Sequence, residues 1–465
     1  MRLRSLTAAL AGVGLLLAGC VGKSQDTAGG QNADAKDVTL TIGANALAGG
    51  KNTATAKWFA EYVIPRFVEA EKAKGITANV RFEGNGADDA DYKTKVALDL
   101  KTGGGADILE VDGIWLGEFA QAGQVKPLAD VVGKDKVDGW DGWSKIPSTV
   151  AALGDFDGKR YGIPTGTDGR VLFFNKKLFA QAGLPADWQP RSWDDIITAG
   201  QALKKLSGVT PIQLNGGTAM TEATTMQGVL PLLVGTGKPV YADGRWQGAT
   251  QNVKDVLDMY QKVYGGGLGD PLLQQEAKGR DKSFSQFADN KIGILLESDY
   301  FWRSVVEPKA GVAKMADRDT AVGWAKIPAM KPGGGVGGQD FVSMSGGSIR
   351  VINPNSKYPQ QAWDLLAFMN SFDATKAKVS GGAQITPRTD VNDDVLAGDP
   401  MLTYISKQVL PITRYRPGLA VYPQVSSALQ QATADVVTGK APDQAAAAYQ
   451  QALTKAVGEA NVAAG

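Results

Sequence analysis

The side chains of this sequence that could carry chemistry are carboxylates and aromatic rings that follow predicted strands. Asp112 and Trp115 come directly after one apolar run, and Asp299, Tyr300 and Trp302 follow another. Aromatic rings stack on the C–H faces of sugars, and carboxylates accept hydrogen bonds from sugar hydroxyls. Carboxylates that flank a glycosidic bond could instead hydrolyse it. These residue types therefore indicate a carbohydrate site, for binding or for hydrolysis.

The composition excludes several other kinds of site. The 465 residues include no histidine and one cysteine, which rules out Ser-His-Asp and Cys-His catalysis, imidazole-bound metals and intramolecular disulfides. Lys and Arg number 49 and Asp and Glu 48, so the chain lacks the basic surface that a nucleic acid requires. We expect a globular protein with no metal, no cofactor and no nucleic-acid partner.

The first 20 residues are typical of an export signal. Arg2 and Arg4 precede a charge-free apolar run over 6–18, which is shorter than the roughly 20 residues that span a membrane. The run ends in Leu17-Ala18-Gly19-Cys20, which resembles the bacterial lipobox, whose cysteine is acylated. An ordinary secretory signal with an incidental cysteine is the alternative.

The lipobox interpretation makes the mature protein a lipoprotein. Residues 1–20 are then a lipoprotein signal peptide, and 21–37, rich in Gly, Ala, Ser, Asp, Asn and Gln, are a flexible tether. Two acyl chains on Cys20 would hold the protein stably on a membrane. We therefore expect a lipid-anchored protein on the extracytoplasmic face of the cell membrane.

The elements that must position the candidate residues alternate between strand and helix. Apolar strands are predicted at 38–42, 78–82 and 107–111, with helical spacing between them, which favours an open, mostly parallel α/β sheet. Further strands are predicted at 171–174 and 292–296. Ligands bind at the carboxyl ends of the strands in such sheets, which is where the aromatic residues gather.

Several segments stand in an order that is found in one family. They are Asp107 to Trp115, Tyr161-Gly162-Ile163-Pro164, Lys291 to Glu297, and Arg416-Pro417 with Tyr422-Pro423. With them, essentially all of 38–465 resembles the extracellular solute-binding proteins of carbohydrate ABC importers, the group that includes the maltose-binding proteins. The resemblance implies a periplasmic-binding-protein-like (type II) fold of two discontinuous α/β lobes joined by a hinge. The first lobe would be 38–163 plus 343–388, and the second 171–335 plus 395–465.

The resemblance also implies a function and a site. A monomer would capture a mono- or oligosaccharide in the cleft between the lobes and deliver it to the membrane permease, without catalysis. The expected ligand contacts, which include the residues singled out above, are Asn45, Asp112, Trp115, Asp168, Asp299, Tyr300, Trp302, Gly346, Gly347, Arg416 and Tyr422. Asp168 could instead be a turn residue, Gly346 and Gly347 a simple tight turn, and Arg416 a helix cap. No residue around 221–227 can be placed.

Three other functions stay open at this point. An exported glycosidase could draw on Asp112, Asp168, Glu222 and Asp299, although no hydrolase motif surrounds any of them. The same fold could serve as a sensor without a transporter. An acidic, aromatic cleft would also suit a polyamine.

Overall fold

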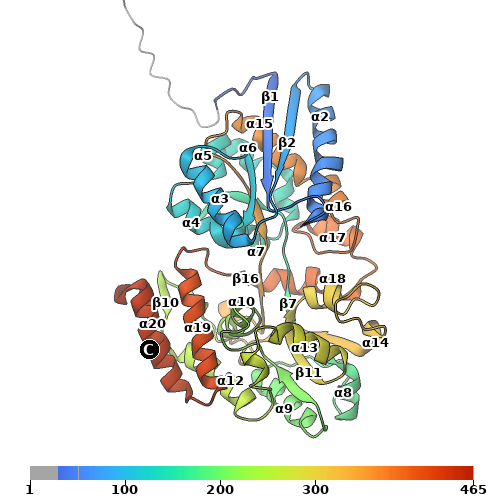
Figure 1. The fold of residues 1–465 in the computed structure, drawn as a ribbon, viewed down its shortest axis with the longest axis vertical. Helices are drawn as coiled ribbons and strands as arrows, with labels where there is room; N and C mark the ends of the chain where they lie inside the picture. Colours follow the sequence, from blue (N-terminus) through green and yellow to red (C-terminus); the bar gives the residue numbers. More distant parts are fainter. Residues whose placement is uncertain (1–29, 51, 464–465) are drawn as a thin grey trace, which may run out of the picture.

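The computed structural model describes residues 30–50 and 52–463 and arranges them in two α/β lobes, one above the other in Figure 1. The sheet of the first lobe has the strand order β2-β1-β3-β15-β6. Its strands are β1 (Asp37–Ala44), β2 (Thr77–Gly84), β3 (Ile108–Asp112), β6 (Gly162–Pro164) and β15 (Ser348–Ile352). Its main helices are α2 (Ile64–Ala73), α3 (Asp89–Thr102), α4 (Leu116–Gln121), α5 (Leu128–Val132), α6 (Lys134–Asp138), α15 (Pro359–Met369) and α16 (Phe372–Lys378).

Helices cover both faces of this first sheet. Ile108 of β3 packs into a core with α2 and α15, whereas its neighbours Leu109 and Val111 pack into a second core with α3 and α4. Successive side chains of a strand point to opposite faces, so a sheet that is covered on both faces needs a continuous apolar run. In β3, Ile108, Leu109 and Val111 meet this need, and the one charged side chain between them, Glu110, is paired with Arg350 of β15.

The sheet of the second lobe has the order β12-β7-β11-β8. Its strands are β7 (Arg170–Asn175), β8 (Thr210–Gln213), β11 (Ile292–Ser298) and β12 (Val322–Ala325). The main helices are α8 (Lys176–Gln181), α9 (Trp193–Leu203), α11 (Leu230–Gly235), α12 (Gln251–Tyr264), α13 (Gly279–Ala288), α18 (Pro400–Tyr404), α19 (Tyr422–Val437) and α20 (Pro442–Val457). Ser192 and Asp195 form a capping box at the start of α9, which satisfies backbone N–H groups at the helix end.

Both sheets are mixed, and the expectation of mostly parallel strands is only partly met. β1 pairs in parallel with β2 and β3, but β15 runs antiparallel to β3, and β7 runs antiparallel to β11 and β12. The antiparallel strands β7 and β15 are the first strands after the chain has crossed from one lobe to the other. A strand that arrives from the other lobe enters its sheet from the edge that faces that lobe, which reverses its direction.

Two crossings of the chain lie against each other between the lobes. Residues 165–169 lead from β6 to β7, and Gly346-Gly347 join β14 (Phe341–Ser345) to β15. A Cβ atom on Gly347 would lie 2.1 Å from the carbonyl oxygen of Gly166, so no side chain fits there. A small sheet, β13 (Ile327–Pro328), β14 and β16 (Thr413–Tyr415), lies beside these crossings.

The N-terminal segment differs from its prediction. Asn32 donates a hydrogen bond to the carbonyl of Lys357, and Gln361 of α15 donates to the carbonyls of Asn32 and Ala33. The tether predicted for 21–37 is therefore wrong for 30–37, where side-chain amides hold the backbone on the first lobe. The signal peptide and Cys20 lie outside the described residues. Within the described part of the chain, no helix is long and apolar enough to cross a membrane.

Candidate functional site

A polar cavity of about 300 Å³ opens at the carboxyl ends of β1 and β3. Asn45, Asp112 and Trp115, three of the predicted ligand contacts, all line it. Other polar and aromatic groups complete the wall, and they are Asn52, Asp89, Tyr92, Glu110 and Ser348. The sequence prediction did not include these residues, because the helix α3 and the returning strand β15 supply several of them and only packing brings them to this place.

Asp112 and Trp115 are positioned by a short turn that follows β3. The carboxylate of Asp112 accepts a hydrogen bond of 3.0 Å from the backbone N–H of Ile114 and so caps a 3₁₀ turn over Gly113–Trp115. The ring of Trp115 is half-buried against Tyr92 and Phe119, with centroids 6.2 and 6.4 Å away. Loss of hydration raises the pKa of Asp112, although the nearby positive charge of Arg416 opposes this.

Arg416 joins acidic groups of the two lobes. Its Nη1 lies 3.1 Å from Oε1 of Glu222 in the second lobe, and its Nη2 lies 3.9 Å from Oδ1 of Asp112 in the first. Burial disfavours its charge, but Asp112, Tyr422 and Glu222 outweigh burial and raise the pKa of Arg416. The alternative that Arg416 is a helix cap is wrong, because these carboxylates are its partners.

Glu222 is the residue that sequence reasoning could not place. Its carboxylate accepts hydrogen bonds of 2.6 Å from the Tyr422 hydroxyl and 2.6 Å from the Ser426 hydroxyl, in addition to the Arg416 contact. Tyr422 was expected to contact the ligand, but it is 1% exposed and its hydroxyl holds Glu222 instead. Burial together with Glu222 raises the pKa of Tyr422 well above the ordinary value. No local motif marks Glu222, since its partners lie about 200 positions further along the chain.

The crossing brings Asp168 next to Gly346. Oδ1 of Asp168 accepts hydrogen bonds of 2.6 Å from both the Gly346 N–H and Nη1 of Arg170. The missing Cβ of Gly346 would lie 3.8 Å from Asp168 and 3.9 Å from Nη2 of Arg416, so these three groups are neighbours. Gly347, in contrast, is explained by its close approach to Gly166.

The loop after β11 corrects two predicted contacts. Asp299 is 1% exposed, and its carboxylate accepts hydrogen bonds from the Gly169 N–H and from Nε of Arg303, so it has a structural role at the crossing. Burial raises the pKa of Asp299, although Arg303 opposes this. Trp302 is 2% exposed and lies in the core. Both were expected to face the ligand.

Trp302 is buried because of the backbone conformation after β11. A π-helical turn over Phe301–Val305 directs Phe301 and Trp302 inwards, whereas Tyr300 stays 36% exposed between the guanidinium groups of Arg280 and Arg303. Predicting this from the sequence would have required the turn type. Tyr300 is the residue of this loop that can still meet a ligand.

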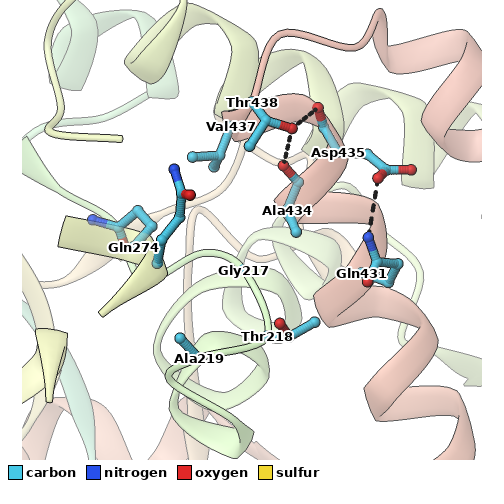
Figure 2. A pocket seen from close by; sticks show the side chains of 10 residues that line it. Gly217, Thr218, Ala219, Gln274, Gln431, Ala434, Asp435, Val437 and Thr438 are labelled. Atoms are coloured by element: carbon cyan, nitrogen blue, oxygen red, sulfur yellow. Dashed lines mark hydrogen bonds between the residues drawn. The ribbon is translucent and has the colours of Figure 1, made fainter. Parts of the chain in front are cut away.

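A second cavity of about 320 Å³ lies in the second lobe between the loop after β8 and the C-terminal half of α19 (Figure 2). Its wall has amides, hydroxyls and no aromatic ring, and it includes none of the predicted contacts. Its one carboxylate, Asp435, already accepts from Gln431 and Lys440. This cavity therefore offers less to a ligand than the one beside Asp112.

Two α/β lobes that are linked by crossing segments beside a polar cavity define a binding protein with a hinge. Residues 43–376 match the family model for bacterial extracellular solute-binding proteins, and the chain belongs to this family. The resemblance found in the sequence is thereby confirmed.

Curated relatives agree with this assignment. A protein of Brucella abortus (strain 2308), provisionally named a binding protein, is 25% identical over 430 residues, which cover 90% of this chain and 96% of that one. The diacetylchitobiose-binding protein of Streptomyces coelicolor is 28% identical over 219 residues, which cover 46% of each chain.

Solved structures share the fold. The cyclic α-maltosyl-1,6-maltose-binding protein from Arthrobacter globiformis has a TM-score of 0.69 and 19% identity, with 91% of this chain and 99% of that one covered. The sugar-binding protein MalE from Xanthomonas citri has a TM-score of 0.70 and 17% identity, with 90% and 98% covered. The predicted two-lobe α/β fold is confirmed.

Proposed function

We propose that this protein is the sugar-binding component of an ABC importer and that it holds a mono- or oligosaccharide between its lobes for delivery to a membrane permease. The observation that carries the proposal is that Trp115 and Asp112 share a cavity beside Arg416 and Glu222 of the opposite side. An aromatic face next to fixed donors and acceptors suits a polyhydroxylated ring. The sugar ligands named for the relatives point the same way.

The charges around the site favour a neutral ligand over a polyamine. Asp168 is paired with Arg170 and Glu110 with Arg350, and Arg416 lies between Glu222 and Asp112, so most carboxylates around the cavity already have a cationic partner. A phosphorylated solute would need a cationic cluster, and Arg416 is already engaged by two carboxylates. A neutral sugar needs neither an excess of negative charge nor an excess of positive charge.

Transport requires that the ligand closes the lobes and is later released without chemical change. Asp112 would contribute from the first lobe, and Glu222 and Arg416 from across the cleft, so a sugar that touches both sides binds the closed state more tightly. Three of the four carboxylates that a glycosidase could use are held by arginines or hydroxyls, which supports binding without hydrolysis; they are Asp168, Asp299 and Glu222. We propose that the protein acts as a monomer, with lobe boundaries close to those given above.

A neutral sugar should raise the melting temperature of the wild-type protein, because it binds the native state alone. Trp115→Ala should weaken the binding of that sugar by about 1–3 kcal/mol, the scale of a lost aromatic contact, whereas Trp115→Phe should keep most of the affinity. A thermal-shift screen with mono- and disaccharides, followed by calorimetry on the best sugar, is the measurement. Equal affinity of wild type and Trp115→Ala would contradict the site, and recovery of cleaved sugar would contradict the binding function.

Cys20 is proposed as the lipid attachment point that holds the protein at the membrane. Cys20→Ala should release the protein from the membrane fraction in the native host, because the lipobox cysteine carries the acyl chains. Mass spectrometry of the wild-type N-terminal peptide should show the added lipid. A Ser24→Ala variant, four residues beyond the cysteine, should stay anchored. If Cys20→Ala remains anchored and the wild-type peptide is unmodified, the lipoprotein assignment fails.

A further inference from the structure

A third cavity, of about 360 Å³, lies in the second lobe along β12 and shares no residue with the site beside Asp112. It is bordered by the start of α8, the loop 186–189 and the end of α18. The helices α8 and α18 lie on the right-hand side of the lower lobe in Figure 1. Arg170 begins β7 beside the crossing, and Phe174 lies four residues further along the strand, near its other end. At about 3.3 Å per residue, it is on the order of 13 Å further from the crossing.

Two half-buried aromatic rings form a corner of this cavity. Trp324 of β12 and Tyr404 of α18 lie with their centroids 6.5 Å apart and their planes 61° apart. The buried rings of Phe174 and Trp188 also line the cavity. A Cβ atom on Gly323 would lie 2.2 Å from the Phe174 ring, so glycine at this position is what leaves room for that ring.

Polar groups stand around the aromatic corner. Gln189 is fixed by hydrogen bonds of 2.9 and 3.1 Å with the backbone N–H and carbonyl of Lys326, which hold the loop 186–189 against β12. The ammonium of Lys176 lies 5.8 Å from the Trp324 ring centre, and Asp187 is exposed at the rim. β12 is an edge strand, so alternate backbone groups along it face away from the sheet.

We propose that this cavity is an accessory carbohydrate site that takes one ring of a neutral saccharide. Its size and its lining of four aromatic rings with a few polar groups are those of small-molecule sites, and the half-buried rings of Trp324 and Tyr404 suit the C–H face of a sugar. Addition of a peptide strand to β12 is disfavoured, because the strand has four residues and Lys176 and Lys326 flank it. The assignment rests on this cavity alone and does not depend on the transport function.

The test uses the full mature protein in a background that disables the first site, Asp112→Ala and Trp115→Ala with Arg416→Ala. Saturation-transfer NMR with millimolar maltose, cellobiose and diacetylchitobiose should still detect binding of at least one of them. Adding Trp324→Ala should reduce the transferred signal at least fivefold, whereas Trp324→Phe should retain it. Because Trp324 contacts Trp302 and its loss could unfold the lobe, Ala186→Arg, which blocks the cavity mouth from an exposed position, gives the same test with the core intact.

The outcomes separate this site from the proposed transport site. No saturation transfer in the Asp112→Ala, Trp115→Ala, Arg416→Ala background, or a signal that neither Trp324→Ala nor Ala186→Arg reduces, overturns the accessory site. A signal carried by an edge-pairing peptide but by none of the sugars also overturns it. If Trp115→Ala alone binds sugar as tightly as the wild-type protein does, while the Trp324-dependent signal persists, the transport site fails and the accessory site stands.

Discussion

Trp302→Ala is expected to lower the free energy of unfolding by about 3–5 kcal/mol, the usual cost of deleting a buried aromatic side chain. The indole N–H donates to the carboxylate of Asp399 at 3.0 Å, and Asp399 in turn caps α18 by accepting from the Leu402 N–H. The guanidinium of Arg318 lies 3.8 Å from the ring centre. The substitution would leave a cavity and remove one anchor of α18.

The same variant should bind sugar with nearly wild-type affinity while it remains folded, because Trp302 is covered by protein. Urea unfolding measures the first effect, and calorimetry at low temperature measures the second. Trp302→Phe should recover much of the stability by refilling the cavity, although it loses the bond to Asp399. If Trp302→Ala left the stability unchanged but weakened sugar binding, Trp302 would be a ligand contact and its assignment to the core would be wrong.

Arg416→Ala is expected to weaken sugar binding about 30-fold or more, equivalent to about 2 kcal/mol. The variant removes the group that lies between Glu222 and Asp112 and leaves their carboxylates facing each other without a counter-charge. Leaving charged groups unpaired costs more than the lost contact itself. Arg414→Ala is the matched control, because Arg414 is exposed on β16, two residues before Arg416.

Arg416 should also govern closure of the lobes. Small-angle scattering of wild-type protein should show a smaller radius of gyration with saturating sugar, and Arg416→Ala should reduce that change at equal sugar occupancy. A wild-type radius of gyration that does not respond to sugar would contradict ligand-driven closure. Equal affinity of Arg416→Ala and Arg414→Ala would remove Arg416 from the site.

Local features of the structure were predictable because local physics sets them. The segment 107–111 is a short run that contains Ile108, Leu109 and Val111, and Ser192 with Asp195 has the spacing of a capping box, so β3 and the start of α9 follow from neighbouring residues. Asp112 and Trp115 could be placed because they come directly after β3. Their approach to Asn45 follows from the pairing of β1 with β3, a topology that the α/β pattern already favours.

The direction of side chains in irregular segments was not predictable. Tyr300, Phe301 and Trp302 are consecutive aromatic residues, and nothing in their order says which one faces solvent. The π-helical turn over Phe301–Val305 decides this, and its hydrogen bonding depends on the packing of the turn against the core of the second lobe.

The amino-acid sequence alone predicts an export signal and determines the excluded chemistries, the alternation of strands and helices and the family resemblance, since each depends on composition or on short-range order. The pairing of Arg416 with Glu222 was decided by the tertiary structure, because the two residues are 194 positions apart. Their meeting requires α19 to pack beside the loop that carries Glu222, and the approach of Asp112 requires the two lobes to face each other. No short segment of the chain encodes either packing.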